Sequence, residues 1–155
     1  MDFLPMPHHV THGEGSFALG WRTPINLVDT QPSALLYAQM LRQAVEEFTG
    51  LRLRLLRGCA HSGEITLTQD SGLPGDTYRL SVAPEGVTVR GGSDEAQLHG
   101  IMTLRQWIQR HGSALPALEV EDAPAMPHRG DYLACSRGRV PTREPRQKTA
   151  DGLCC

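Results

Sequence analysis

The sequence is poor in aromatic residues, nearly balanced in charge and without long apolar runs, and each shortage excludes a class of protein. Aromatic residues make up 5% of the 155 positions. Lysine and arginine total 15 against 17 acidic residues, so the net charge is −2 and the pI is near 6.4. Such a chain has no concentrated positive field for nucleic acid or an anionic membrane surface. No segment reaches the roughly eighteen apolar residues of a membrane span. We therefore expect neither nucleic acid nor membrane as a partner.

The N-terminus also lacks the marks of a secretory signal, because it has neither a basic start nor an apolar core of sufficient length. From this we expect a cytoplasmic protein. Cysteine pairs at ligand-like spacing are equally lacking, and we expect reduced thiols. The four cysteines are Cys59, Cys135, Cys154 and Cys155. No motif indicates a cofactor.

Three histidines near the N-terminus, His8, His9 and His12, suggest one possible metal site. Closely spaced imidazoles are common in zinc sites. Histidines in a polar loop without fixed partners are more often solvated, however. We expect no metal site here and keep a small metal-binding protein as an alternative.

What the sequence does contain is the composition of an ordinary folded domain. Its apolar fraction is 39% and its charged fraction 21%, values typical of globular proteins. Its length suits one domain, or one domain plus a fragment. Residues 32–48 have an apolar repeat of 3.6 residues and are predicted to form a helix, with Pro32 in its first turn and Gly50 at its stop. The predicted buried stripe is Ala34, Tyr37, Leu41, Ala44, Val45 and Phe48.

The remaining segments read mainly as short strands. Residues 1–15 are predicted to be an extended lead-in to a first strand at 16–19. Alternation of apolar and polar residues predicts further strands at 51–55 and 64–68. Residues 78–82 and 87–89 alternate on either side of a four-residue turn, which predicts a β-hairpin.

A second helix is predicted from Ser93 or Asp94 to His111, followed by a last strand through Leu118 and Val120. Its predicted buried stripe is Leu98, Ile101, Leu104 and Ile108. Gly100 lies inside this helix, where glycine costs about 1 kcal/mol relative to alanine. We expect a close contact between helix and sheet to compensate. The predicted fold class is α+β, a mainly antiparallel sheet with two helices on one face.

Two sets of residues resemble motifs of one enzyme family, glycoside hydrolase family 20, the β-N-acetylhexosaminidases. The second predicted helix carries Gly-x-x-Thr-Leu-x-Gln, at Gly100, Thr103, Leu104 and Gln106. The other set runs through Asp122-Ala123-Pro124, Pro127-His128-Arg129-Gly130, Leu133-Ala134-Cys135-Ser136-Arg137 and Val140-Pro141-Thr142. This second set resembles the start of the family's catalytic barrel. The chain departs from the family pattern at Met126, where an aromatic is common, and at Ala134, where Asp is usual.

The resemblance implies a division of the chain into two parts. Residues 1–122 would be the hexosaminidase-type N-terminal α+β domain. Residues 123–155 would be a linker and the first strand and helix of the (β/α)8 barrel, cut short. A complete barrel needs about 250 residues.

The resemblance also implies where chemistry is missing. Family 20 enzymes are understood to use the substrate's own acetamido group as nucleophile, assisted by an adjacent Asp-Glu pair on the fourth barrel strand. No position of this chain corresponds to that pair, so we expect no catalytic residue. Asp94-Glu95 has the same letters but opens a helix, where acidic side chains favour the positive dipole end.

One substrate-binding residue carries over from the family. Arg129 corresponds to the arginine that binds hydroxyls of the terminal sugar, a task suited to a guanidinium fork. The alternative is that Arg129 pairs with a nearby carboxylate such as Asp122 or Asp131.

These implications predict a non-catalytic N-terminal domain of a β-N-acetylhexosaminidase, inactive by itself. Its partner would be the remainder of the catalytic barrel. The parent enzyme would hydrolyse terminal non-reducing N-acetylhexosamine residues of glycans by a substrate-assisted retaining mechanism. The alternative from another class is a stand-alone carbohydrate-binding or scaffold module. Such a module would stack sugars on exposed aromatics, for which the chain offers only Trp21, Trp107 and a few tyrosines.

Overall fold

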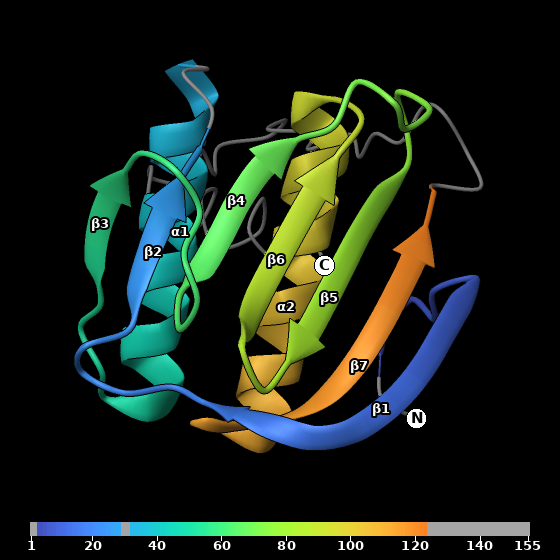
Figure 1. Cartoon of the computed structure of the whole chain (residues 1–155). Helices are drawn as coiled ribbons and strands as arrows, with labels where there is room; N and C mark the ends of the chain where they lie inside the picture. The colour runs from blue at the N-terminus through green and yellow to red at the C-terminus, as the bar shows by residue number, and fades with distance from the viewer. Residues whose placement is uncertain (1–2, 29–31, 124–155) are drawn as a thin grey trace, which may run out of the picture.

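The computed structural model describes residues 3–28 and 32–123, which form a seven-stranded sheet with two helices side by side on one face (Figure 1). In chain order the elements are β1 (His9–Ala18), β2 (Pro24–Leu27), α1 (Pro32–Thr49), β3 (Arg54–Arg57), β4 (Ile65–Gln69), β5 (Tyr78–Ala83), β6 (Gly86–Gly91), α2 (Asp94–His111) and β7 (Ala114–Asp122). Neither helix in these ranges is long and apolar enough to cross a membrane. The expected barrel start at 123–155, with Arg129, falls outside the described residues except for Ala123.

The sheet is mixed, which corrects the prediction of a mainly antiparallel one. Its strand order is β1-β7-β5-β6-β4-β2-β3. The pairings among β1, β7, β5 and β6 are antiparallel, whereas β6–β4, β4–β2 and β2–β3 are parallel. The parallel half arises because α1 connects β2 to its neighbour β3 as a βαβ unit. The α+β class and the position of both helices on one face are as predicted.

The error comes from β2, a strand that the sequence analysis missed. Ile25, Asn26 and Leu27 are all buried, so this strand has no alternation of exposed and buried residues. Internal parallel strands lack that signal, since both of their faces are covered. Without β2, the helix at 32–49 had no preceding strand and the βαβ unit could not be recognised.

The first strand is longer than predicted. The lead-in was expected to reach residue 15, but β1 begins at His9 and pairs with β7, with a register shift between His12 and Ser16. Most of its side chains are exposed because it is an edge strand, so its sequence has little apolar periodicity. Ahead of it, Phe3 stacks on Trp107 with ring centroids 5.3 Å apart. The strand predicted at 51–55 is also displaced, to Arg54–Arg57.

Helix α2 follows the sequence prediction closely. Ser93 is its N-cap and accepts a hydrogen bond from the Ala96 amide at 3.2 Å. The helix ends before Gly112, whose φ of 66° suits glycine. Its buried side is broader than the predicted stripe, because Trp107 is also only 2% exposed whereas Leu98 is half-buried.

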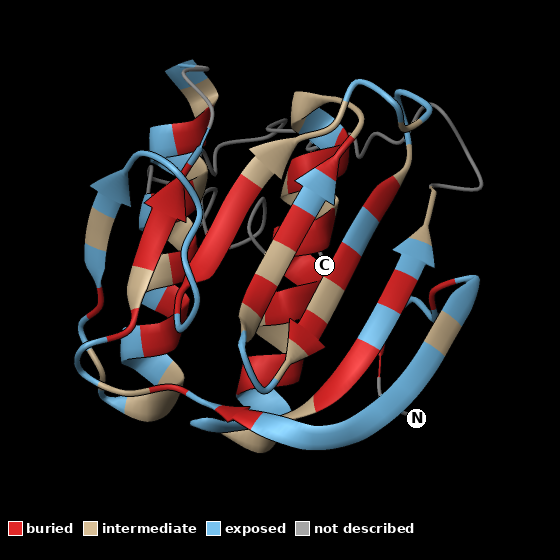
Figure 2. Cartoon of the chain, in the orientation of Figure 1, coloured by how far each residue is buried: buried red, intermediate tan, exposed pale blue. Residues whose placement is uncertain are grey.

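Gly100 makes the close approach to the sheet that its position predicted. A Cβ atom there would lie 2.7 Å from Val89 Cγ1 and 3.1 Å from Tyr78 Cδ2. The absence of a side chain therefore lets α2 pack directly on β5 and β6. Figure 2 shows the resulting core, with buried residues on the sheet strands and on the helices behind them.

Candidate functional site

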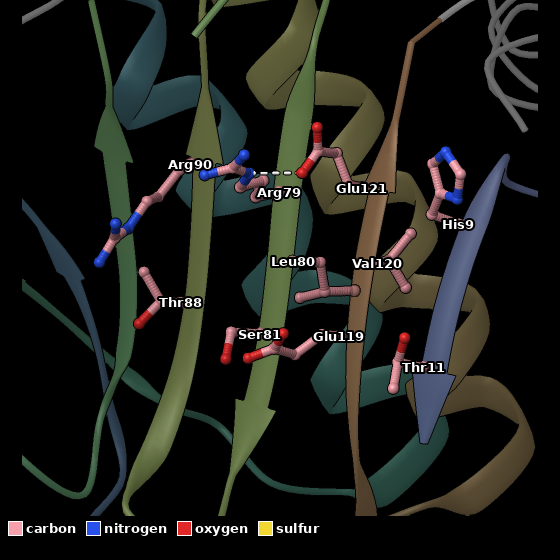
Figure 3. Close-up of a pocket in the computed structure, with 10 residues that line it drawn as sticks. All are labelled: His9, Thr11, Arg79, Leu80, Ser81, Thr88, Arg90, Glu119, Val120 and Glu121. Atoms are coloured by element: carbon pink, nitrogen blue, oxygen red, sulfur yellow. Dashed lines mark hydrogen bonds and ion pairs between the residues drawn. The ribbon is translucent and has the colours of Figure 1, made fainter. Parts of the chain in front are cut away.

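The open face of the sheet, on the side away from the helices, carries a polar groove of about 540 Å³ over β1, β7, β5 and β6 (Figure 3). Because side chains alternate along a strand, the residues between the core positions point into it. Its polar lining is His9, Thr11, Arg79, Ser81, Thr88, Arg90, Glu119 and Glu121. The sequence analysis did not identify this groove.

Strand register orders the lining into rows. His9 pairs with Glu121, Glu121 with Arg79, and Arg79 with Arg90, so one row is rich in charge. Arg79 Nε donates to Glu121 Oε2 at 2.7 Å. This hydrogen bond, followed by the attraction of the Glu121 carboxylate, raises the pKa of Arg79. Both side chains are about half exposed, at 52% and 47%, so the ion pair stabilises the fold little.

The groove does not have the chemistry of a glycosidase site. Glu119 and Glu121 lie two residues apart on one face of β7, which superficially suggests a carboxylate pair. Glu121 is ion-paired to Arg79 and open to solvent, whereas a general acid must be held protonated, usually by burial. The groove lining also has no phenylalanine, tyrosine or tryptophan.

A second polar cluster closes the end of β7 at Asp122. The His8 imidazole Nδ1 lies 2.5 Å from Asp122 Oδ1, and the His8 amide donates to the same oxygen at 3.1 Å. Tyr78 donates to Asp122 Oδ2 at 3.4 Å and lies 2.7 Å from Thr103 Oγ1. Burial, reinforced by the negative charge of Asp122, raises the pKa of Tyr78 well above its usual value of 10, although the Thr103 hydrogen bond lowers it. Asp122, a possible partner for Arg129, is thus already engaged by His8 and Tyr78.

The three histidines proposed as metal ligands have different surroundings. His8 contacts Asp122, His9 lines the groove, and His12 lies near Trp107 with ring centroids 6.2 Å apart. Within residues 3–28 and 32–123, no three His, Cys, Asp or Glu side chains are arranged to hold a metal ion.

Asp94, the first letter of the Asp-Glu pair, has a structural role. It accepts hydrogen bonds from Ser33 Oγ and from Gln69 Nε2, the latter at 2.5 Å. It therefore ties the start of α2 to α1 and to β4. The nearby Tyr37 has its pKa raised by burial and then by the charges of Asp94 and Glu95.

A buried carboxylate that the sequence analysis did not identify, Glu64, anchors the loop before β4. It is 4% exposed, and its Oε1 accepts from Asn26 Nδ2 at 2.8 Å and from the His61 amide at 2.6 Å. Asn26 Nδ2 also donates to the Cys59 carbonyl at 2.8 Å. These bonds hold loop 58–63 in place, so Glu64 is a structural residue. A single buried glutamate beside a strand gives no signal that distinguishes it in sequence.

Exposed aromatic side chains, which a sugar-binding module needs, are scarce in the described residues. Trp107 is buried and donates its indole N–H to the Pro116 carbonyl at 3.1 Å. Tyr78 is also buried. Of the described phenylalanine, tyrosine and tryptophan residues, Trp21 alone is largely exposed, at 69%.

Comparison with known proteins gives one consistent result. The model for "Glycosyl hydrolase family 20, domain 2" matches residues 1–123. The β-hexosaminidase of Vibrio furnissii is 28% identical over 142 residues, which cover 88% of this chain and 22% of that enzyme. The family 20 β-N-acetylhexosaminidase of Streptomyces coelicolor A3(2) superposes with a TM-score of 0.67 at 27% identity, covering 78% of this chain and 26% of that one.

A third likeness concerns the fold alone. The chitobiase of Flavobacterium johnsoniae gives a TM-score of 0.77 at 23% identity, covering 96% of this chain and 24% of that one. This chain thus spans about a quarter or less of the length of each of these three relatives.

Proposed function

The chain belongs to glycosyl hydrolase family 20, and from that membership we propose that it is the non-catalytic α+β domain that accompanies a catalytic barrel in a β-N-acetylhexosaminidase. The parent would hydrolyse terminal N-acetylhexosamine residues of glycans. Support comes from the relatives, which are enzymes several times longer than the matched region. It also comes from the polar groove, whose carboxylates lack the burial of a catalytic acid.

The observation that carries the proposal is the difference between the two sides of the domain. The open sheet face is polar, whereas helix α1 exposes Leu35 at 43% and Leu36 at 57%. At about 100° per residue, Leu36 lies roughly 200° around α1 from the buried Ala34 and so points away from the sheet. Exposed apolar side chains on one face indicate a contact surface. We place the barrel on this helix side.

The N-terminal segment presents a further exposed apolar side chain, beside α2. Leu4 is 73% exposed, yet its backbone is fixed to α2 by two bonds: its amide donates to Gln106 Oε1 at 2.8 Å, and Gln106 Nε2 donates to its carbonyl at 2.9 Å. Gln106 belongs to the family motif of this helix. A fixed backbone therefore presents a second exposed apolar position, beside α2, that a partner domain can cover.

The test is turnover of a chromogenic N-acetyl-β-glucosaminide by the purified 155-residue chain. We expect a rate equal to that of buffer, with the V. furnissii enzyme as the active control in the same assay. Turnover above buffer that is retained through successive purification steps would overturn the non-catalytic assignment.

The stand-alone carbohydrate-binding module remains the alternative from another class. Such modules use platforms of several exposed phenylalanine, tyrosine or tryptophan rings, and the groove lining has none of these residues. Binding of a chito-oligosaccharide in the groove, seen as chemical-shift changes at Ser81 and Thr88, would favour the module instead.

A further inference from the structure

We propose that Trp21 and Arg22, at the tip of the turn between β1 and β2, form an accessory contact for one sugar ring of a glycan. This inference rests on the proposed function, because it assigns the parent a glycan substrate. The contact lies on this domain and is additional to any site in a barrel.

Trp21 is far more exposed than is usual for a large apolar side chain. It is 69% exposed, whereas Trp107, the other tryptophan of the chain, is 2% exposed. An indole is the largest apolar side chain, and it is enriched where proteins contact ligands and partners. Leaving this ring in water therefore indicates a contact that the isolated domain does not make.

The turn that presents Trp21 is held by its own hydrogen bonds. The Thr23 amide donates to the Gly20 carbonyl at 3.0 Å, and the Gly20 amide donates to Thr23 Oγ1 at 3.1 Å. Thr23 is 7% exposed, and Leu19 is tied through its amide to the Ser113 carbonyl at 2.7 Å. A ligand at the tip would meet a backbone that is already ordered, which lowers the entropic cost of binding.

Arg22 completes the contact chemically. Its guanidinium carbon lies 4.5 Å from the centre of the Trp21 ring, within the range of a cation–π interaction. The guanidinium lies over the ring, and Trp21 as a whole is still 69% exposed and so accessible to a ligand. A pyranose has an apolar face and a rim of hydroxyls, so it can stack on the indole while the arginine donors reach its oxygens.

The surroundings favour a sugar over a protein partner. Ala18, Ser113 and Ala114 are exposed next to the base of the turn, where Ala18 pairs with Ala114. A side chain added at Gly20 would meet nothing within 4 Å. A protein interface needs a contiguous apolar core, whereas one ring beside small residues matches the size of one sugar unit.

The experiment uses the two tryptophans as internal reporters. N,N′-diacetylchitobiose is titrated to about 20 mM into the 155-residue chain while acrylamide quenching of fluorescence is measured. We expect the sugar to protect the fluorescence of Trp21, the accessible tryptophan, from acrylamide quenching, and the protection to saturate. The Kd should lie in the millimolar range, about that of a single weak contact. No protection at the highest concentration would overturn the proposal.

Variants test which residues bind the sugar. Binding to them is measured by saturation-transfer NMR, which observes the ligand signals and therefore does not need the Trp21 fluorescence. Trp21→Ala is expected to weaken binding by about tenfold or more, and Arg22→Ala by a few fold. Leu56→Ala, at an exposed apolar residue on β3, is the matched control and should bind like the unaltered chain. Unchanged binding in Trp21→Ala would contradict the proposal. Failure of this contact would leave the turnover result, and hence the proposed function, unaffected.

Discussion

Substitution of Gly100 by alanine tests how tightly α2 packs on the sheet. In an open helix this change stabilises by about 1 kcal/mol, because alanine is the better helix former. Here the added methyl would lie 2.7 Å from Val89 Cγ1 and 3.1 Å from Tyr78 Cδ2. Both neighbours are buried and neither can move into solvent. Overpacking of this kind typically costs about 1–3 kcal/mol.

We therefore expect Gly100→Ala to destabilise the domain by about 1 kcal/mol net, as the clash outweighs the gain in helix propensity. Urea unfolding followed by circular dichroism measures the change as a shift of the midpoint at constant slope.

The matched control is a double-mutant cycle with Val89→Ala, which removes the nearer of the two clashing atoms. The two substitutions should be less destabilising together than the sum of their separate effects, by about 1 kcal/mol. A stabilising Gly100→Ala, with no coupling to Val89, would show that the helix does not approach the sheet as closely as described.

Three further predictions concern the polar clusters. Glu64→Ala should destabilise the domain by about 2–3 kcal/mol in urea unfolding, because it leaves Asn26 and the His61 amide without their buried acceptor. A loss below about 0.5 kcal/mol, the usual effect of a surface substitution, would contradict this prediction. The folded-state pKa of Tyr78 is raised above its unfolded value of 10, so the stability that this group contributes is fully present below about pH 10 and is lost as the pH rises further. Tyr78→Phe should therefore make the decrease in the free energy of unfolding at alkaline pH less steep. An unchanged slope would contradict this prediction. Arg79→Ala should leave the urea midpoint almost unchanged, because both side chains of its ion pair with Glu121 are about half exposed. A clear loss of stability would contradict this description of the groove.

The sequence predicted those elements whose signals are local. The helix at Pro32–Thr49, the hairpin at Tyr78–Gly91 and the capped helix beginning after Ser93 each have their own periodicity or turn residues, and the structure contains all three. Gly100 was also interpretable, because a glycine inside a helix needs a compensating contact and α2 makes one with Val89.

The features that could not be predicted from the sequence depend on contacts between residues far apart in the chain. β2 is buried on both faces, by α1 on one side and by the loop and Glu64 around Asn26 on the other, and β1 is a strand because β7 pairs with it. The groove joins residues from four strands, and its composition follows from register rather than from any local motif. Likewise, the exposure of Trp21 and the burial of Glu64 are properties of the folded surface. Arg129 lies outside the described residues and stays a prediction.

The most direct test of the central claim is a domain exchange. Residues 1–123 replace the matching segment of the V. furnissii β-hexosaminidase, and hydrolysis of a chromogenic N-acetyl-β-glucosaminide is measured alongside thermal stability. If this chain is an accessory domain that packs through its helices, the chimera should remain active, and Leu36→Asp should lower its stability without changing the isolated domain. An inactive or unfolded chimera, or a Leu36→Asp variant as stable as its parent, would contradict the account.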